Sequence, residues 1–126
     1  MKICLAQINI ELGKVQDNTE TIVNWIKRAG SEGHDLIVFP EMCDTGYDMN
    51  VILKTSSEWN GAVIESIKQA AATANINVIV GISERVEDGV YNSIAVLDRK
   101  GKLIGKYRKT HLITAEPTFE DKFLKA

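Results

Sequence analysis

Leu36-Ile37-Val38-Phe39-Pro40-Glu41 is the stretch that decides the fold. Four consecutive apolar residues without alternation are typical of a strand covered on both faces, as in a parallel sheet. Pro40 ends this strand because proline has no N–H for the sheet ladder. The carboxylate of Glu41 therefore follows directly at the carboxyl end of a predicted buried strand.

The segments before and after this strand predict an alternation of strands and helices. Lys2 to Asn9 is rich in β-forming residues and predicts a first strand. Asp17-x-x-Glu20 predicts a capping box at the start of a helix that Gly30 or Gly33 ends. A second helix is expected from about Ser57 to Asn75. The apolar positions expected to face the sheet are Ile22, Val23, Ile26 and Ala29 in the first helix and Val63, Ile64, Ile67, Ala70, Ala71 and Ala74 in the second.

Three further strands are predicted in the second half of the chain. Val78 to Ile82 is an apolar run, and Asp88-Gly89 marks a turn after it. Tyr91–Leu97 and Leu103–Lys109 read as two strands joined by the hairpin Asp98-Arg99-Lys100-Gly101. The order β-α-β-α-β-β-β predicts an α/β fold with a mixed sheet, two main helices and parallel neighbours joined by right-handed crossovers.

Composition limits the class of protein. The chain has 126 residues, 44% hydrophobic and 25% charged, with a net charge of -2, as expected for one domain with a single core. This charge argues against a nucleic-acid or anionic-membrane partner. Arg99 to Lys109 contains six Lys or Arg residues, which we interpret as a solvated hairpin with one functional lysine. No segment has the length expected of a bilayer span.

The cysteines and known motifs exclude several other classes. Cys4 and Cys43 have no CxxC spacing, so we expect reduced thiols and a cytoplasmic location. The chain has no HExxH, Walker or GxGxxG motif, so no metal and no organic cofactor are expected. A flavodoxin-like nucleotide binder is a weaker alternative, because the first strand leads into Ile10-Glu11-Leu12-Gly13 instead of a glycine-rich phosphate loop.

Two ionisable side chains are predicted to meet at one edge of the sheet. Glu41 follows the second predicted strand and Lys109 ends the last one, and catalytic groups in open α/β sheets gather at the carboxyl ends of strands. A carboxylate and an ammonium at that edge have the chemistry of a base and an oxyanion clamp for splitting an amide. The structural alternative is that Glu41 caps a loop while Lys109 points into water.

The order of short motifs resembles the nitrilase (carbon–nitrogen hydrolase) superfamily over essentially the whole chain. Those motifs are Phe39-Pro40-Glu41-Met42, Thr45-Gly46-Tyr47, Tyr91-Asn92-Ser93, Gly101 to Gly105 and Tyr107-Arg108-Lys109-Thr110-His111-Leu112. The resemblance implies an αββα sandwich, of which residues 1–126 would form the amino-terminal part, roughly its first half, within a single carbon–nitrogen hydrolase domain. It also implies a Glu-Lys-Cys triad.

Roles for individual residues follow from the same resemblance. Glu41 would be the general base and Lys109 would stabilise the oxyanion of the tetrahedral intermediate. A second glutamate after the lysine would orient the substrate and Lys109, and Glu120 in Phe119-Glu120-Asp121 matches best, with Glu116 as the runner-up. His111 lies two residues after Lys109, where a hydrogen-bonded structural histidine is favoured over one that lines the site.

The nucleophilic cysteine is the departure from the family pattern. Neither Cys4 nor Cys43 stands at the motif position, so we expect the nucleophile in polypeptide beyond Ala126, with Cys43 packed in the wall of the site. The resemblance favours a small amide or carbamoyl substrate and a homo-oligomer. The alternative is a catalytically inert half-domain that self-associates or pairs with a complementing fragment.

Overall fold

A mixed six-stranded sheet forms the centre of the computed structural model, which describes residues 1–126. The strand order is β1-β2-β4-β5-β6, and β3 pairs separately with β4. β1, β2 and β4 are parallel, whereas β4, β5 and β6 are antiparallel neighbours. The strands are β1 (Ile3–Leu5), β2 (Leu36–Val38), β3 (Ser57–Glu58), β4 (Asn77–Val86), β5 (Gly89–Leu97) and β6 (Leu103–Arg108). Since β6 is antiparallel to β5, it runs in the same direction as β4 and its parallel neighbour β2. The carboxyl ends of β2 and β6 therefore lie at the same edge of the sheet.

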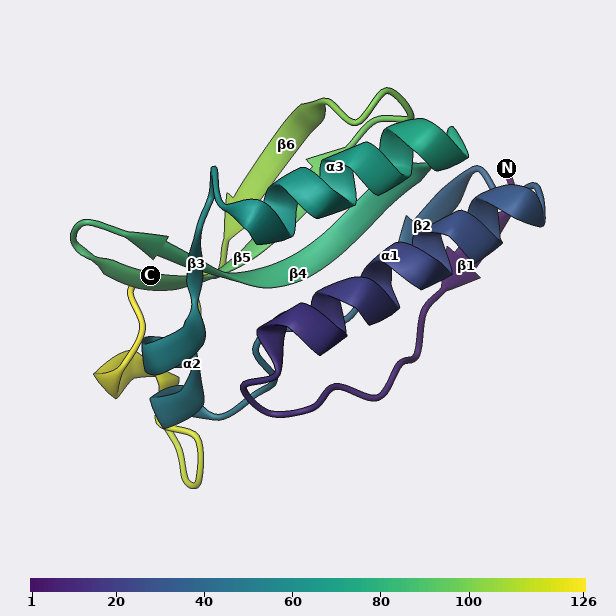
Figure 1. Cartoon of the computed structure of the whole chain (residues 1–126). Coiled ribbons are helices and arrows are strands. Elements are labelled where there is room, and N and C mark those ends of the chain that lie inside the picture. The colour runs from purple at the N-terminus through teal and green to yellow at the C-terminus, as the bar shows by residue number, and fades with distance from the viewer.

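Two helices, α1 (Val15–Ser31) and α3 (Ala62–Ala74), lie side by side on one face of the sheet (Figure 1). A Cβ on Gly30 would lie 2.6 Å from the backbone oxygen of Ala74, so glycine permits their close approach. The main core lies between this helix pair and the sheet. It includes the fully buried side chains Ile22, Ile26, Ile37, Ile64, Ile67, Val78, Val80 and Leu97.

The opposite face of the sheet is only partly covered. α2 (Met49–Thr55) and the C-terminal segment lie at one end, where they enclose a second cluster (Figure 1). Its buried residues are Met42, Met49, Ile52, Val90 and Leu124. Elsewhere on this face no helix covers the sheet, and Leu5 of β1 and Tyr107 of β6, which belong to the two edge strands, are 75% and 53% exposed. The expectation that the Leu36–Phe39 strand is covered on both faces is therefore wrong, because Leu36 and Val38 are only half-buried.

Most predicted elements are present, with different boundaries at the start of the chain. The first strand covers Ile3–Leu5 and not Lys2–Asn9, because its partner β2 ends at Val38, two residues before Pro40. The capping box is wrong: α1 begins at Val15 and Asp17 lies inside its first turn, where a carboxylate favours the helix dipole. The helix continues through Gly30, and Gly33 follows its end with φ of +73°.

The region predicted as one helix from Ser57 to Asn75 divides into two elements. Ser57 and Glu58 form β3, and α3 starts after Gly61. The seven-residue α2 was not predicted, although Asp48 caps it by accepting a hydrogen bond from the Val51 N–H at 3.0 Å. The hairpin between β5 and β6 is confirmed, with the Gly101 N–H donating to the Asp98 carbonyl at 2.9 Å. None of the helices combines the length and apolar character that crossing a membrane requires.

Candidate active site

Glu41 lies on a loop that crosses β4 immediately after β2. The loop is held by the Cys43 N–H, which donates to the Gly81 carbonyl at 3.0 Å. A Cβ on Gly81 would lie 2.5 Å from the Pro40 oxygen and 2.6 Å from the Glu41 Cα, so this close contact requires glycine. The side chain of Glu41 remains half-exposed, at 49%.

Lys109 lies directly after β6, where its N–H donates to the Asn92 carbonyl of β5 at 2.8 Å. Its Nζ lies 3.7 Å from Glu41 Oε1 and 3.0 Å from Glu120 Oε2. The structure therefore brings together the three residues that the sequence singled out. Their shared location follows from the sheet, since β2 and β6 end at the same edge.

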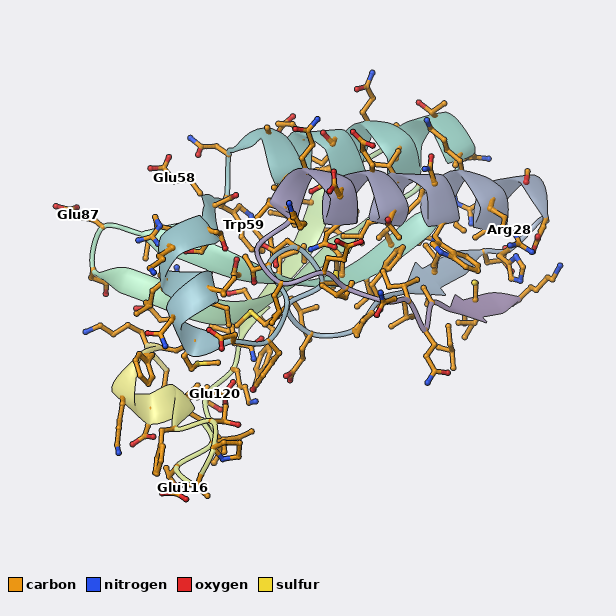
Figure 2. All side chains as sticks on the ribbon, turned by 60° about the horizontal axis from the view of Figure 1, so that its bottom comes forward. Arg28, Glu58, Trp59, Glu87, Glu116 and Glu120 are labelled. Carbon is orange, nitrogen blue, oxygen red and sulfur yellow. The ribbon has the colours of Figure 1, made fainter.

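Glu120 opens the short 3-10 helix η1 (Glu120–Lys122) and is fully buried. The Ile113 N–H donates to its Oε2 at 2.8 Å, and Asn92 Nδ2 donates to its Oε1 at 3.3 Å. The hydroxyl of Tyr47 also donates to Oε1. Glu116, the runner-up for this position, is exposed at the outer tip of the C-terminal loop, farther from the sheet than Glu120 (Figure 2).

The surroundings of Glu120 favour its ionised form. Burial by itself raises the pKa of this carboxyl, but the hydrogen bonds from Tyr47, Ile113, Lys109 and Asn92 outweigh burial and lower the pKa below its usual value. Burial, together with the neighbouring Glu120 carboxylate, raises the pKa of the Tyr47 hydroxyl. At neutral pH the cluster thus contains an ionised buried carboxylate and a protonated phenol.

Neither cysteine is placed as a nucleophile for this cluster. The Sγ of Cys43 is fully buried and donates to the Gly81 carbonyl at 3.0 Å. Burial, followed by the nearby Asp44, raises the pKa of this thiol well above its ordinary value, which disfavours the reactive thiolate. Cys4 lies in β1 and packs against the core under α1 and α3.

His111 does not join the cluster. It is exposed, and its Nδ1 lies 3.1 Å from the Thr110 hydroxyl, which has no contact with either glutamate. The sequence argument favoured a hydrogen-bonded histidine over one that lines the site, and the geometry agrees with that preference.

Sequence reasoning gave no role to Asn92 and Tyr47, although both stand in motifs that carried the resemblance. Asn92 Nδ2 reaches Glu41 Oε2 at 3.4 Å as well as Glu120. A signal was present: Asn92 and Ser93 interrupt the apolar pattern of β5, and a polar residue such as Asn92 in the middle of a strand indicates a functional or hydrogen-bonded position. The contact of Tyr47 had no such signal, because its partner lies 73 residues later.

A second buried carboxylate, Glu84 of β4, was also missed. It is fully buried on the helix-covered face and pairs with Arg108, whose Nε and Nη2 lie 2.8 and 2.9 Å from its two oxygens. Lys106 and Ser93 also donate to it. Burial by itself would raise the pKa of Glu84, but these donors outweigh it and hold the pKa at about 2.

Comparison with known proteins identifies the family. The family model described as carbon-nitrogen hydrolase matches residues 2–125. The chain belongs to the carbon–nitrogen hydrolase family. It is 29% identical over 123 residues to a nitrilase from Pyrococcus abyssi, covering 94% of this chain and 47% of the relative. It is 30% identical over 110 residues to a 2-oxoglutaramate amidase from Bacillus subtilis, covering 86% and 42%.

A solved structure supports the fold. An amidase from Nesterenkonia sp. superimposes with a TM-score of 0.85 at 21% identity, covering 100% of this chain and 48% of the amidase. The expected nitrilase-type α/β architecture is confirmed by this match. The chain spans about half the length of these carbon–nitrogen hydrolase relatives.

Proposed function

We propose that these 126 residues supply the Glu-Lys part of an amide-hydrolysing Glu-Lys-Cys site, with a small amide or carbamoyl compound as the substrate. The observation that carries the proposal is the position of the Lys109 ammonium between Glu41, at 3.7 Å, and Glu120, at 3.0 Å. The nucleophilic thiol would come from polypeptide outside these residues, because Cys43 is buried and Cys4 lies under the helices.

In this mechanism Glu41 accepts the proton of the cysteine thiol as the sulfur attacks the amide carbon. A C–S bond forms, and the negative charge on the former carbonyl oxygen lies beside the Lys109 ammonium. The C–N bond then breaks, and the leaving nitrogen takes the proton from Glu41 and departs as ammonia or an amine. Water, deprotonated by Glu41, hydrolyses the thioester to a carboxylic acid and restores the thiol.

The half-exposed carboxylate of Glu41 supports its role as the base. Its only polar contacts are long, 3.4 Å to Asn92 Nδ2 and 3.7 Å to Lys109 Nζ. Lone pairs of Glu41 therefore remain available to accept the proton of the thiol. Glu120 by contrast has both oxygens engaged, which supports a role in orienting Lys109. We also infer a cytoplasmic location, which two unpaired cysteines favour.

The test compares the 126-residue chain with the polypeptide encoded by the uninterrupted reading frame that contains it. Both are incubated with small amides, ammonia is measured, and acyl-thioesters are trapped by acid quench and located by mass spectrometry. We expect ammonia release and a thioester on a cysteine outside residues 1–126. Turnover by the isolated chain that persists in the Cys4→Ala/Cys43→Ala double variant would contradict a cysteine mechanism.

The uncovered part of the sheet favours a second candidate, an inert half-domain that forms a homo-oligomer or pairs with a complementing fragment. Leu5 is 75% exposed on that face, and exposed apolar sheet surfaces drive association. Sedimentation velocity on the isolated chain tests it: Leu5→Lys should dissociate the assembly, whereas Leu12→Lys in the N-terminal loop should not. A monomer at every concentration would exclude self-association.

A further inference from the structure

Four donors surround the carboxylate of Glu120, and they come from three separate parts of the chain: the loop before α2, strand β5 and the segment after β6. The Ile113 N–H lies 2.8 Å from Oε2, and Asn92 Nδ2 lies 3.3 Å from Oε1. Lys109 Nζ contacts both oxygens, at 3.0 and 3.3 Å, and Tyr47 donates to Oε1. A fully buried carboxylate with this many donors is ionised and fixed in position.

Asn92 connects this buried carboxylate with the exposed one. Its amide nitrogen lies 3.3 Å from Glu120 and 3.4 Å from Glu41, so it bridges the two acids in the same way as the Lys109 ammonium does. Two carboxylates in one site repel each other, and a neutral donor shared between them reduces this repulsion without adding a charge. Asn92 is itself buried, so its amide must be used by these partners.

We propose that Tyr47 and Asn92 are positioning residues that fix Glu120 as the permanent counter-anion of Lys109 and thereby hold the ammonium beside Glu41. The reaction served by this arrangement rests on the proposed function, but the arrangement itself is a property of the isolated chain. Tyr47 has no hydrogen bond to Glu41, and Asn92 touches it only through the long 3.4 Å contact to Oε2. Their effect passes through Glu120. Because the oxygens of Glu120 are occupied by these donors, Glu41 is the carboxylate whose lone pairs stay free to accept a proton.

The titratable groups that face Glu120 are Lys109 after β6, Tyr47 before α2 and Glu41 after β2. Removal of one neutral donor weakens the ionised form of Glu120 and raises the pH at which this carboxyl takes up a proton. The Ile113 N–H reports that event directly, because it donates to Glu120 Oε2. Its proton and nitrogen shifts should change as Glu120 titrates.

The experiment follows the Ile113 amide signal in 1H–15N NMR spectra of the 126-residue chain as a function of pH. Tyr47→Phe removes only the hydroxyl, and Asn92→Leu removes the amide with little change in shape. Two matched controls lie elsewhere. Tyr107→Phe removes a hydroxyl that lies 3.4 Å from the Thr110 oxygen, and Asn77→Leu removes an amide that donates to the Asp35 carbonyl at 2.8 Å.

We expect the midpoint of the Ile113 titration to rise by about one pH unit in Tyr47→Phe and in Asn92→Leu, as the loss of a hydrogen bond to a charged group implies. The controls should leave the midpoint unchanged. An unchanged midpoint in a folded Tyr47→Phe or Asn92→Leu variant would overturn the positioning role of that residue. Because Tyr47 is partly exposed, its variant should fold even if Asn92→Leu does not.

The readout also separates this inference from the proposed function. The titration is measured without substrate, so a failed amide assay leaves it intact. Conversely, unshifted midpoints in both variants would leave the assignment of Glu41 and Lys109 untouched.

Discussion

Arg108 and Lys109 are consecutive residues whose side chains bind carboxylates on opposite faces of the sheet. Arg108 pairs with the buried Glu84 on the helix-covered face, at 2.8 and 2.9 Å. Lys109 reaches Glu120 and Glu41 on the other face, at 3.0 and 3.7 Å. The alternation of side chains along a strand produces this division. One cation thus stabilises the end of β6, and the next one is available to the candidate active site.

Loss of the Arg108 cation should destabilise the fold. Arg108→Met leaves Glu84 buried with only Lys106 and Ser93 as partners. We expect the free energy of unfolding in urea to fall by about 1–2 kcal/mol. This figure is smaller than for a fully buried ion pair, because the guanidinium is partly exposed and solvent screens its charge. Arg99→Met is the matched control, since Arg99 lies 3.9 Å from Asp35 at the surface. Equal stabilities for the two variants would contradict the role given to Arg108.

Acid should weaken the fold through Glu84. Its pKa is held at about 2 in the folded chain, below the ordinary value of 4.5, so the unfolded state binds more protons as the pH falls. The stabilisation is therefore complete above pH 4.5 and is lost as the pH falls toward 2. Urea unfolding between pH 6 and 2 should show a loss of roughly 2 kcal/mol that Glu84→Gln lacks, with solvent screening allowed for. If the stability of the parent and of Glu84→Gln fell equally with pH, Glu84 would not be the source of the acid sensitivity.

The two glutamates of the site should respond differently to the same substitution. Glu120→Gln places an amide NH2 among four donors in a buried site, and we expect a loss of about 2 kcal/mol in unfolding free energy. Glu41→Gln should leave stability unchanged because Glu41 is half-exposed and its contacts are long. Chemical denaturation of both variants measures this difference. A larger loss of unfolding free energy in Glu41→Gln than in Glu120→Gln would contradict the description of Glu120 as the buried, fully bonded carboxylate and Glu41 as the loosely held one.

The glycine beneath the Glu41 loop should tolerate no side chain. In Gly81→Ala the new Cβ would lie 2.5 Å from the Pro40 oxygen, and this backbone atom has no room to move without shifting the loop. We expect about 2 kcal/mol of destabilisation in a denaturation curve. Gly105→Ala is the control, since its Cβ meets only the Val96 side chain at 3.3 Å. If Gly81→Ala were as stable as the control, the close packing of this loop on β4 would be wrong.

The convergence of Glu41 and Lys109 was predictable because it follows from strand order. Leu36–Phe39 and Leu103–Lys109 carry local strand signals. The parallel crossover from β2 to β4, followed by two antiparallel connections, places the carboxyl ends of β2 and β6 at one edge. The hairpin through Gly101 was predictable for the same reason, because its turn residues are adjacent in the sequence. These predictions required no contact between distant side chains.

The rest depended on contacts that local patterns do not encode. Tyr47 and Glu120 are separated by 73 residues, and Asn92 and Glu120 by 28. Glu84 lies beyond the predicted Val78–Ile82 strand and was given no role, because only the paired strands bring Ser93 and Arg108 against it. The short α2 was missed because seven residues give too little periodicity to recognise.

The role of Lys109 in amide hydrolysis is tested most directly by the rate of ammonia release from a small amide. The measurement compares Lys109→Ala with Lys102→Ala in the polypeptide encoded by the uninterrupted reading frame. Lys109→Ala should lower kcat/KM by roughly 10³-fold, the usual effect of removing an oxyanion-stabilising group, and Lys102→Ala should leave it unchanged. A Lys109→Ala protein that retains a rate within tenfold of the parent would contradict the function proposed for this site.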